Sequence, residues 1–323
     1  MADPKQQKTA VVIPVYNRDW IINDALESVL AQTRCPDHLI VIDDGSCDDT
    51  VKTIEQWRDQ HHPSFAMTID VLAQNQGQNG ARNRGVELAC DCDLIAYLDS
   101  DDVWPATYLE EMIGQLEENP ELIATARNYW QDSGDGLGRV DYDLSAISTD
   151  APLQIFKRHT AAPSSTVVRR SAHQAIGGWD QQVFCVTDLD YFLRMSCTGP
   201  FGWNSGEPIE IRWMTGHGDN DPSLVHESSR VRRPAGAILR MEILEKFIFD
   251  LGGRNLIPEP IWKERLATGW FRVGRKLVRK KRKEEAKWCY LRVSELRPFD
   301  IRCRWHRWIR CFRVAPRRPA KTD

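Results

Sequence analysis

Short apolar runs alternate with amphipathic stretches over the first hundred residues. Each run stops at a polar break, which is typical of strands in a buried sheet. The predicted strands are residues 9–14, 39–42, 66–72 and 94–98. The predicted helices between them are residues 20–32, 48–61 and 78–89. This β-α-β alternation predicts an α/β fold with a mostly parallel central sheet and helices on both faces.

The remaining pattern predicts more of the same domain, followed by a helical C-terminal extension. Up to residue 228 we expect helices at 105–119 and 186–194 and strands at 122–129, 163–170 and 209–214. Residues 131–150 are rich in Gly, Asp and Ser and predict a flexible loop. Residues 229–323 read as helices, with Ile238, Met241, Leu244 and Ile248 forming one apolar stripe suited to core packing against the sheet domain. The predicted division is therefore a disordered segment 1–8, a domain 9–228 and a helical region 229–323.

Composition adds the class of protein and its setting. The 323 residues are 41% hydrophobic and 28% charged, as in an ordinary globular protein. No apolar run approaches the roughly 18 residues that cross a bilayer, and no signal-peptide pattern is seen. The nine cysteines are scattered without zinc-site spacing. We therefore expect a reducing, cytoplasmic location.

Charge is distributed unevenly along the chain. Residues 270–323 hold 19 Lys and Arg against 5 Asp and Glu, whereas the net charge of the whole chain is −3. Residues 301–312 place Ile and aromatic residues at helical spacing between arginines, as in a helix that lies on a membrane surface. Packing of this stripe on the chain's own helices is the alternative. No nucleic-acid motif accompanies the charge, so we expect no nucleic-acid partner but allow peripheral contact with the inner membrane face.

Polar groups follow three of the predicted strands at the point where each strand ends. Asn17 follows the first strand, Asp43 and Asp44 the second, and Asp99 and Asp101 the fourth. Ligands bind beyond the carboxyl ends of strands in open α/β sheets, and crowded carboxylates near phosphate suit Mg²⁺ or Mn²⁺. Helix capping by the acidic residues is the alternative. Neither a Gly-x-Gly-x-x-Gly nor a P-loop pattern is present, which excludes the common dinucleotide and NTPase sites.

Four blocks of sequence together resemble the family 2 glycosyltransferases. The blocks are Val12-Ile13-Pro14-Val15-Tyr16-Asn17, Val41-Ile42-Asp43-Asp44-Gly45-Ser46-Cys47-Asp48-Asp49-Thr50, Asn75-Gln76-Gly77 with Ala81-Arg82-Asn83-Arg84-Gly85, and Tyr97-Leu98-Asp99-Ser100-Asp101-Asp102. Their order and spacing are those of the family, and the resemblance is dense over residues 9–110. It implies a GT-A fold that binds a nucleotide sugar, a UDP-sugar by expectation, with a divalent cation.

Carried over position by position, the resemblance implies a role for each block. Asp101 is implied to bind the metal, and Arg82 to hold the base or the pyrophosphate, for which a guanidinium fork is well suited. The residues implied to line the donor pocket are Pro14, Tyr16, Asn17, Asp43, Asp44, Arg82 and Asp99. An ion pair on the helix surface is the alternative for Arg82.

Two later stretches add the acceptor side. Asp188, in residues 186–194, stands where the family has its catalytic base, although Thr187 and Leu189 depart from the usual pattern. Asp190 is the competing candidate, and a plain helix-start acid is the alternative for both. Gly178, Trp179 and Asp180 resemble a family turn that borders the acceptor, and a purely structural tight turn is the alternative. His217, in a Gly-rich segment, is implied to join the metal or touch the diphosphate, with simple solvation as the alternative.

The combined prediction is an inverting glycosyltransferase. Asp188 takes the proton of an acceptor hydroxyl, which displaces the nucleotide in one step. We expect a saccharide or lipid-linked acceptor and a role in polysaccharide biosynthesis, with loops 131–150 and 215–228 setting specificity. The alternatives are a sugar nucleotidyltransferase, which normally has a Gly-rich basic loop after its first strand, and a non-catalytic nucleotide-sugar-binding module.

Overall fold

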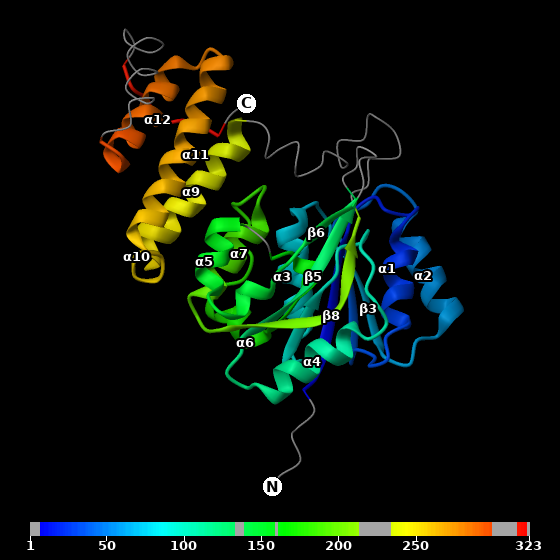
Figure 1. The fold of residues 1–323 in the computed structure, drawn as a ribbon. Helices are drawn as coiled ribbons and strands as arrows, with labels where there is room; N and C mark the ends of the chain where they lie inside the picture. Colours follow the sequence, from blue (N-terminus) through cyan, green and yellow to red (C-terminus); the bar gives the residue numbers. More distant parts are fainter. Residues whose placement is uncertain (1–6, 133–138, 159–160, 213–233, 299–314, 322–323) are drawn as a thin grey trace. The chain divides into compact units, whose positions relative to one another are not determined.

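The computed structural model describes residues 7–132, 139–158, 161–212, 234–298 and 315–321 (Figure 1). The chain divides into two compact units, Met1–Leu224 and Val225–Asp323, and each is described by itself. Of the segment 1–8 that the sequence predicts as disordered, residues 1–6 lie outside the described residues. Gln7 donates its backbone N–H to the Glu117 carboxylate at 3.0 Å, and the Lys8 carbonyl accepts from Asp93 and Leu94.

The first unit is built on one mixed sheet. Its strands run in the order β3-β2-β1-β4-β7-β5-β6, and β8 pairs with β5. The bounds are β1 Thr9–Val15, β2 His38–Asp43, β3 Ala66–Val71, β4 Leu94–Tyr97, β5 Ala124–Asp132, β6 Arg139–Tyr142, β7 Thr166–Arg169 and β8 Phe201–Ile211. The half formed by β1–β4 is parallel, β7 runs antiparallel to β4 and β5, and β8 is parallel to β5. The carboxyl ends of β1, β2 and β4 therefore meet at one edge.

Helices pack around this sheet (Figure 1). The bounds are α1 Ile22–Leu30, α2 Thr50–His61, α3 Gly77–Leu88, α4 Tyr108–Glu118, α5 Ala151–Arg158, α6 Arg170–Ala175 and α7 Thr187–Ser196. Helix α3 lies close against β1, because a Cβ added at Gly85 would overlap the Val12 side chain. This close approach fixes the height of α3 over the strand ends.

The fold class predicted from the sequence is confirmed, with corrections to its elements. Helices α5 and α6 were not expected. Strand β7 begins at Thr166 rather than at residue 163, and β8 begins at Phe201 rather than at residue 209. Part of the predicted flexible loop 131–150 is ordered: β6 pairs antiparallel with β5, and Ser145–Ser148 forms a 3₁₀ turn. Strand β6 is mostly exposed, so it is held by backbone pairing with β5 and not by burial of alternating apolar side chains. Its sequence therefore has no apolar periodicity from which a strand could be predicted. Residues 133–138 lie outside the described residues.

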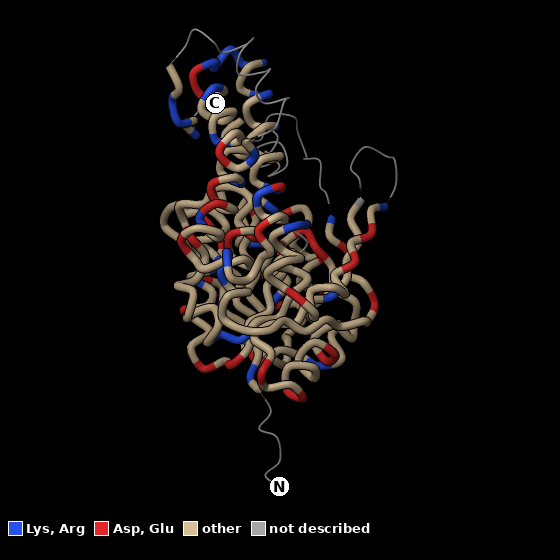
Figure 2. The backbone as a smooth tube through the Cα atoms, turned by 60° about the vertical axis from the view of Figure 1, so that its left-hand side comes forward, with Lys and Arg blue, Asp and Glu red and all other residues tan. Residues whose placement is uncertain are grey.

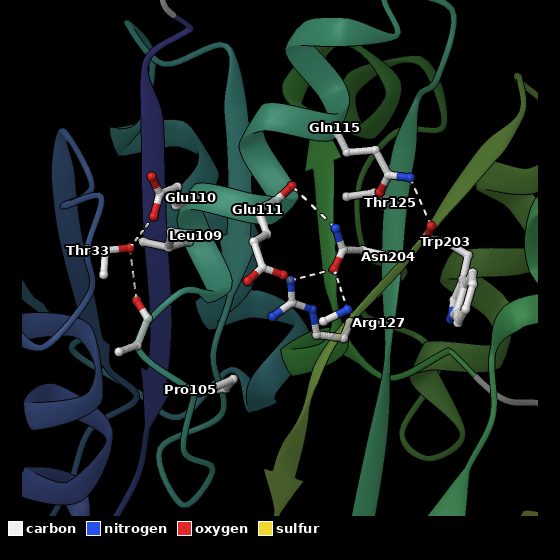
Figure 3. A network of polar contacts seen from close by, with 12 residues as sticks. Thr33, Pro105, Leu109, Glu110, Glu111, Gln115, Thr125, Arg127, Trp203 and Asn204 are labelled. Atoms are coloured by element: carbon white, nitrogen blue, oxygen red, sulfur yellow. Dashed lines mark hydrogen bonds and ion pairs between the residues drawn. The ribbon is translucent and has the colours of Figure 1, made fainter.

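A polar network joins α4 to β5 and β8 beside the sheet (Figure 3). The fully buried Arg127 guanidinium donates to Glu111 at 2.7 Å and to the Asn204 amide oxygen at 2.6 Å. It also lies 5.1 Å from the centre of the Tyr108 ring. Gly206 is required here, because a Cβ would collide with both Glu111 and Arg127. The network therefore fixes α4 against β5 and β8.

The second unit is helical, as predicted. Its helices are α9 Pro234–Asp250, α10 Gly253–Leu256, α11 Glu259–Arg279 and α12 Lys283–Leu296, and α11 packs on both α9 and α12. The four residues of the predicted apolar stripe are at most 4% exposed. Within this unit, Met241 packs on α11, because a Cβ added at Gly269 would overlap its side chain. Figure 2 shows the many Lys and Arg positions along these helices. The aromatic stripe at 301–312 lies outside the described residues.

None of the helices in the described part of the chain has the length and apolar character to span a bilayer.

Candidate functional site

The ends of β1 and β2 form a turn held together by side chains of the predicted pocket. Asp43 closes the turn by accepting the backbone N–H groups of Gly45 at 3.2 Å and Ser46 at 2.9 Å with one carboxylate oxygen. Asn17, at a φ of 51°, accepts the Cys47 N–H at 2.8 Å. The other Asp43 oxygen, Oδ1, is buried and has no hydrogen-bond partner among the described residues. A buried acceptor without a partner is costly, so it is a natural contact for a ligand N–H or O–H.

Three further residues of the predicted pocket lie at the same strand ends. They are Asp44 after β2, Pro14 in β1 and Tyr16 after β1. Asp44 is 3% exposed and accepts the Gln76 N–H at 2.7 Å, which ties the end of β2 to the start of α3. Burial raises the pKa of the Asp44 carboxyl. Pro14 is buried in β1 opposite Ile42, whereas Tyr16 is partly exposed. Asp44 therefore supports the pocket through the backbone.

Arg82 reaches the same edge from α3. It is 1% exposed, contacts the Asp99 carboxylate at 2.5 Å, and lies 4.7 Å from the centre of the Trp179 ring. Its Nε and Nη1 are buried, and neither has a hydrogen-bond partner within the described ranges. Asp99, at 32% side-chain exposure, is the solvent-facing member of the pair. The buried ion pair excludes the alternative of a helix-surface contact for Arg82.

A buried aromatic cluster supports Arg82 from behind. Trp179 stacks on Tyr191 with ring centres 3.7 Å apart and planes at 4°. His173 lies 3.0 Å from the Tyr97 hydroxyl and 2.9 Å from the Tyr191 hydroxyl, and burial lowers its pKa to about 4. The structure therefore places Trp179 in the core, 2% exposed, rather than on an open acceptor face.

Three carboxylates crowd the end of β4. Burial and the neighbouring Asp99 charge raise the pKa of Asp101 to about 6. Burial, with the charges of Asp101 and Asp99, raises the pKa of Asp102 well above its usual value. Asp102 accepts the Ser164 hydroxyl at 2.5 Å and the Arg212 backbone N–H at 3.0 Å. The same Ser164 oxygen accepts the Asp99 N–H at 3.0 Å.

Ser164 was not singled out in the sequence. It holds Asp99 and Asp102 in place from the 3₁₀ turn Pro163–Ser165, whereas the sequence placed it inside a predicted strand at 163–170 and carried no signal for this role.

The carboxylates suit a cation that also takes ligands from a substrate. In the described ranges no three His, Cys, Asp or Glu side chains are arranged to hold a metal ion by themselves. Mg²⁺ commonly uses only one or two protein carboxylates and completes its shell with phosphate oxygens and water. Asp101, with Asp99 beside it, fits that pattern. His217 lies outside the described residues.

Asp188 and Asp190 have different surroundings in the first turn of α7. Asp188 is partly exposed, and its Oδ1 accepts the Leu189 N–H at 2.9 Å. Burial raises the pKa of the Tyr129 hydroxyl, and the charges of Asp188 and Asp102 add to the effect. Tyr129 thus lies within electrostatic range of both carboxylates, so Asp188 shares the region of the acidic strand end.

Asp190 instead forms a buried ion pair. It is 3% exposed and contacts Arg194 at 2.6 and 2.8 Å. Arg194 also donates to the carbonyls of Ile176 and Gly178 at 2.9 and 2.8 Å. Gly178, at a φ of 73°, has no room for a Cβ beside His173, and Asp180 accepts the Gln182 N–H at 2.9 Å. These contacts explain the Gly-Gly-Trp-Asp turn as the support of α7.

Solved structures with this fold define its class. The chain is similar to Staphylococcus aureus TarS 1-349 in complex with UDP-GlcNAc, with a TM-score of 0.60 and 17% identity over 90% of this chain and 88% of that one. It is also similar to the mannosyltransferase PcManGT of Pyrobaculum calidifontis in complex with GDP-Man and Mn²⁺, with a TM-score of 0.57 and 15% identity over 96% and 86% of the two chains. The fold is that of the GT-A glycosyltransferases, as predicted.

The sequence assigns the family. Residues 10–177 match the sequence model of glycosyl transferase family 2. The chain is 30% identical over 190 residues to the uncharacterized glycosyltransferase YwdF of Bacillus subtilis. This alignment covers 58% of this chain and 67% of YwdF. It is 39% identical over 109 residues to the succinoglycan biosynthesis protein ExoW of Rhizobium meliloti. This second alignment covers 32% of each chain. The chain belongs to glycosyl transferase family 2, which confirms the predicted family and enzyme class.

The matches span two thirds of YwdF but only about a third of ExoW.

Proposed function

We propose that the protein transfers a sugar from a nucleotide sugar to an acceptor hydroxyl, with inversion at the anomeric carbon. A UDP-sugar is the donor that we favour. The observation that carries this proposal is the gathering of Asp43, Arg82 and Asp101 at one sheet edge, with Asp188 near the same acidic strand end. The UDP-GlcNAc complex of TarS supports a UDP donor, and the GDP-Man complex of PcManGT makes a guanosine donor the alternative to test.

The donor nucleotide is proposed to satisfy the buried groups that lack partners. The free oxygen of Asp43 accepts an N–H of the base or a ribose hydroxyl. Arg82, held by Asp99 and Trp179, offers two further N–H groups to the base or the pyrophosphate. Pro14, Tyr16, Asn17 and Asp44 shape the pocket between these groups.

Asp101, beside Asp99, is proposed to hold the divalent cation, with His217 as a further ligand. When bound, Mn²⁺ or Mg²⁺ would neutralise charge on the departing diphosphate. Burial and the Asp99 charge both raise the pKa of Asp101, and a bound cation would offset both effects. The Mn²⁺ complex of PcManGT supports a divalent cation at this kind of site without choosing between the two metals.

Asp188 is proposed as the general base. It takes the proton of the acceptor hydroxyl while the hydroxyl oxygen bonds to the anomeric carbon, and the bond from that carbon to the diphosphate oxygen breaks with its electron pair. Attack opposite the leaving group inverts the centre without an enzyme nucleophile. The acceptor is proposed to be a saccharide or lipid-linked glycan, since ExoW is named for succinoglycan biosynthesis. The basic region of residues 301–313 is proposed to contact the membrane peripherally.

The test is a donor screen. Purified protein with Mn²⁺ is incubated with UDP- and GDP-sugars, and the released nucleoside diphosphate is measured together with the anomeric form of the product. We expect one donor class to be turned over, and Asp188→Asn to lose turnover while still binding the nucleotide. Asp59→Asn, a change at an exposed carboxylate on α2, is the control. Failure of the protein to turn over or bind any donor would refute the proposal.

A further inference from the structure

Arg18 is a fixed residue with an unused hydrogen-bond donor. It follows Asn17 in the loop after β1, and its backbone N–H donates to the Thr50 hydroxyl at 2.8 Å. Its carbonyl accepts the N–H groups of Ile21 and Ile22 at 3.1 and 3.0 Å, so the backbone on both sides is held. Its Nη1, however, is buried and has no hydrogen-bond partner in the part of the chain that the structure describes.

Arg18 and a second arginine, Arg212, differ in their ion pairs. Arg18 and Arg212 are both close enough to Asp101 for their charges to lower its pKa. Arg212 is already neutralised by ion pairs with Asp24 and, at 3.1 Å, with Glu210. Arg18 makes no ion pair with any residue in the described part of the chain, Asp101 included. Of the two arginines whose charges act on Asp101, Arg18 is therefore the one without an ion pair among the described residues.

A buried guanidinium N–H without an acceptor costs free energy in the empty protein. An anionic group with planar oxygens, such as a phosphate, removes that cost with charge-assisted hydrogen bonds. The anion would be repelled by Asp101 unless that carboxylate also carried a cation. The arrangement therefore fits a phosphate group that lies between an arginine and a cation.

We infer that Arg18 binds the diphosphate of the donor near Asp101, the carboxylate proposed to hold the cation. This inference rests on the proposed function. It assigns Arg18 to the phosphates, whereas Asp43 and the turn around it serve the nucleoside. Arg18 then orients the leaving group and disperses its charge as the glycosidic bond breaks.

The test compares ligands that differ only in their phosphates. Calorimetric titration with UDP, UMP and uridine, repeated with GDP, GMP and guanosine, is done at fixed Mn²⁺ on wild type, Arg18→Ala and Arg18→Lys. Arg84→Ala is the matched control, because Arg84 lies on α3 and is already paired with Asp70 at 2.8 Å. We expect Arg18→Ala to weaken diphosphate binding roughly 10- to 100-fold, the range for hydrogen bonds to charged groups, with a smaller loss for the monophosphate and none for the nucleoside.

The outcomes separate the inference from the proposed function. An unchanged diphosphate affinity in Arg18→Ala, or an equal loss for all three ligands, overturns the role of Arg18 while the glycosyltransferase assignment stands. A wild-type protein that binds neither UDP nor GDP overturns both. Thermal unfolding of each variant reports its folding, and Arg18→Lys decides the question if the alanine variant does not fold. That variant keeps the charge but not the planar fork, so we expect its diphosphate affinity to lie between those of wild type and Arg18→Ala.

Discussion

Two carboxylates stand two residues apart in α7, and the structure predicts opposite consequences for their loss. Asp190 is 3% exposed and bound to Arg194, whose side chain is 11% exposed. Asp188 is partly exposed and is the proposed base. Asp190→Ala should therefore act on folding stability, whereas Asp188→Asn should act on turnover.

The magnitude for Asp190→Ala follows from the charge that is left behind. Removing one partner of a buried ion pair typically costs about 3–5 kcal/mol. Arg194 keeps the carbonyls of Ile176 and Gly178 as acceptors, which argues for the lower end, about 3 kcal/mol. For a domain of this size each kcal/mol lowers the melting temperature by about 2–4 °C, so we expect a loss of about 6–12 °C.

Asp188→Asn keeps the volume and one acceptor oxygen at a partly exposed position. We expect it to change stability by less than about 1 kcal/mol. Turnover should fall by roughly 10²- to 10⁴-fold, the usual contribution of a general base. Differential scanning calorimetry and donor turnover, measured on the same preparations, give both quantities. An Asp190→Asn variant that melts as wild type but no longer turns over donor would refute the assignment and make Asp190 the base.

Three further predictions concern the frame of the site. Glu111→Ala leaves the fully buried Arg127 without its carboxylate and should cost about 3 kcal/mol in urea unfolding, whereas Glu118→Ala, at an exposed position on the same helix, should cost little. Gly85→Ala should destabilise by about 1–3 kcal/mol because its methyl group meets Val12, whereas Gly114→Ala has open space in α4 and should stabilise slightly; equal effects in urea titration would contradict this packing. His173 is neutral in the folded protein, with a pKa near 4 against 6.5 when unfolded, so the unfolded chain binds more protons as the pH falls from 6.5 to 4. Stability should therefore drop by about 3 kcal/mol over that range, and His173→Asn should lack this loss in pH-dependent unfolding.

The local pattern of apolar and polar residues was sufficient to predict the strands in the parallel half of the sheet. Each apolar run ends in a polar or acidic residue, and neighbouring parallel strands bring those ends together, so the meeting of Asn17, Asp43 and Asp99 followed from the sequence. Exposed or irregular elements were less visible. Strand β6 has no apolar alternation, and the start of β8 contains polar residues and glycine that mask a strand.

The sequence by itself determined the family, the sheet with acidic strand ends and the candidate residues, because these depend on periodicity and on residues near one another in the chain. Only the tertiary structure decided what each polar side chain does. It buried Arg82 between Asp99 and Trp179, paired Asp190 with Arg194 and used Ser164 to hold the acidic turn. It also left the Arg18 Nη1 without a hydrogen-bond partner among the described residues. Burial and pairing depend on contacts between segments far apart in the chain, and these settle whether a charge is neutralised by the protein or available for a ligand.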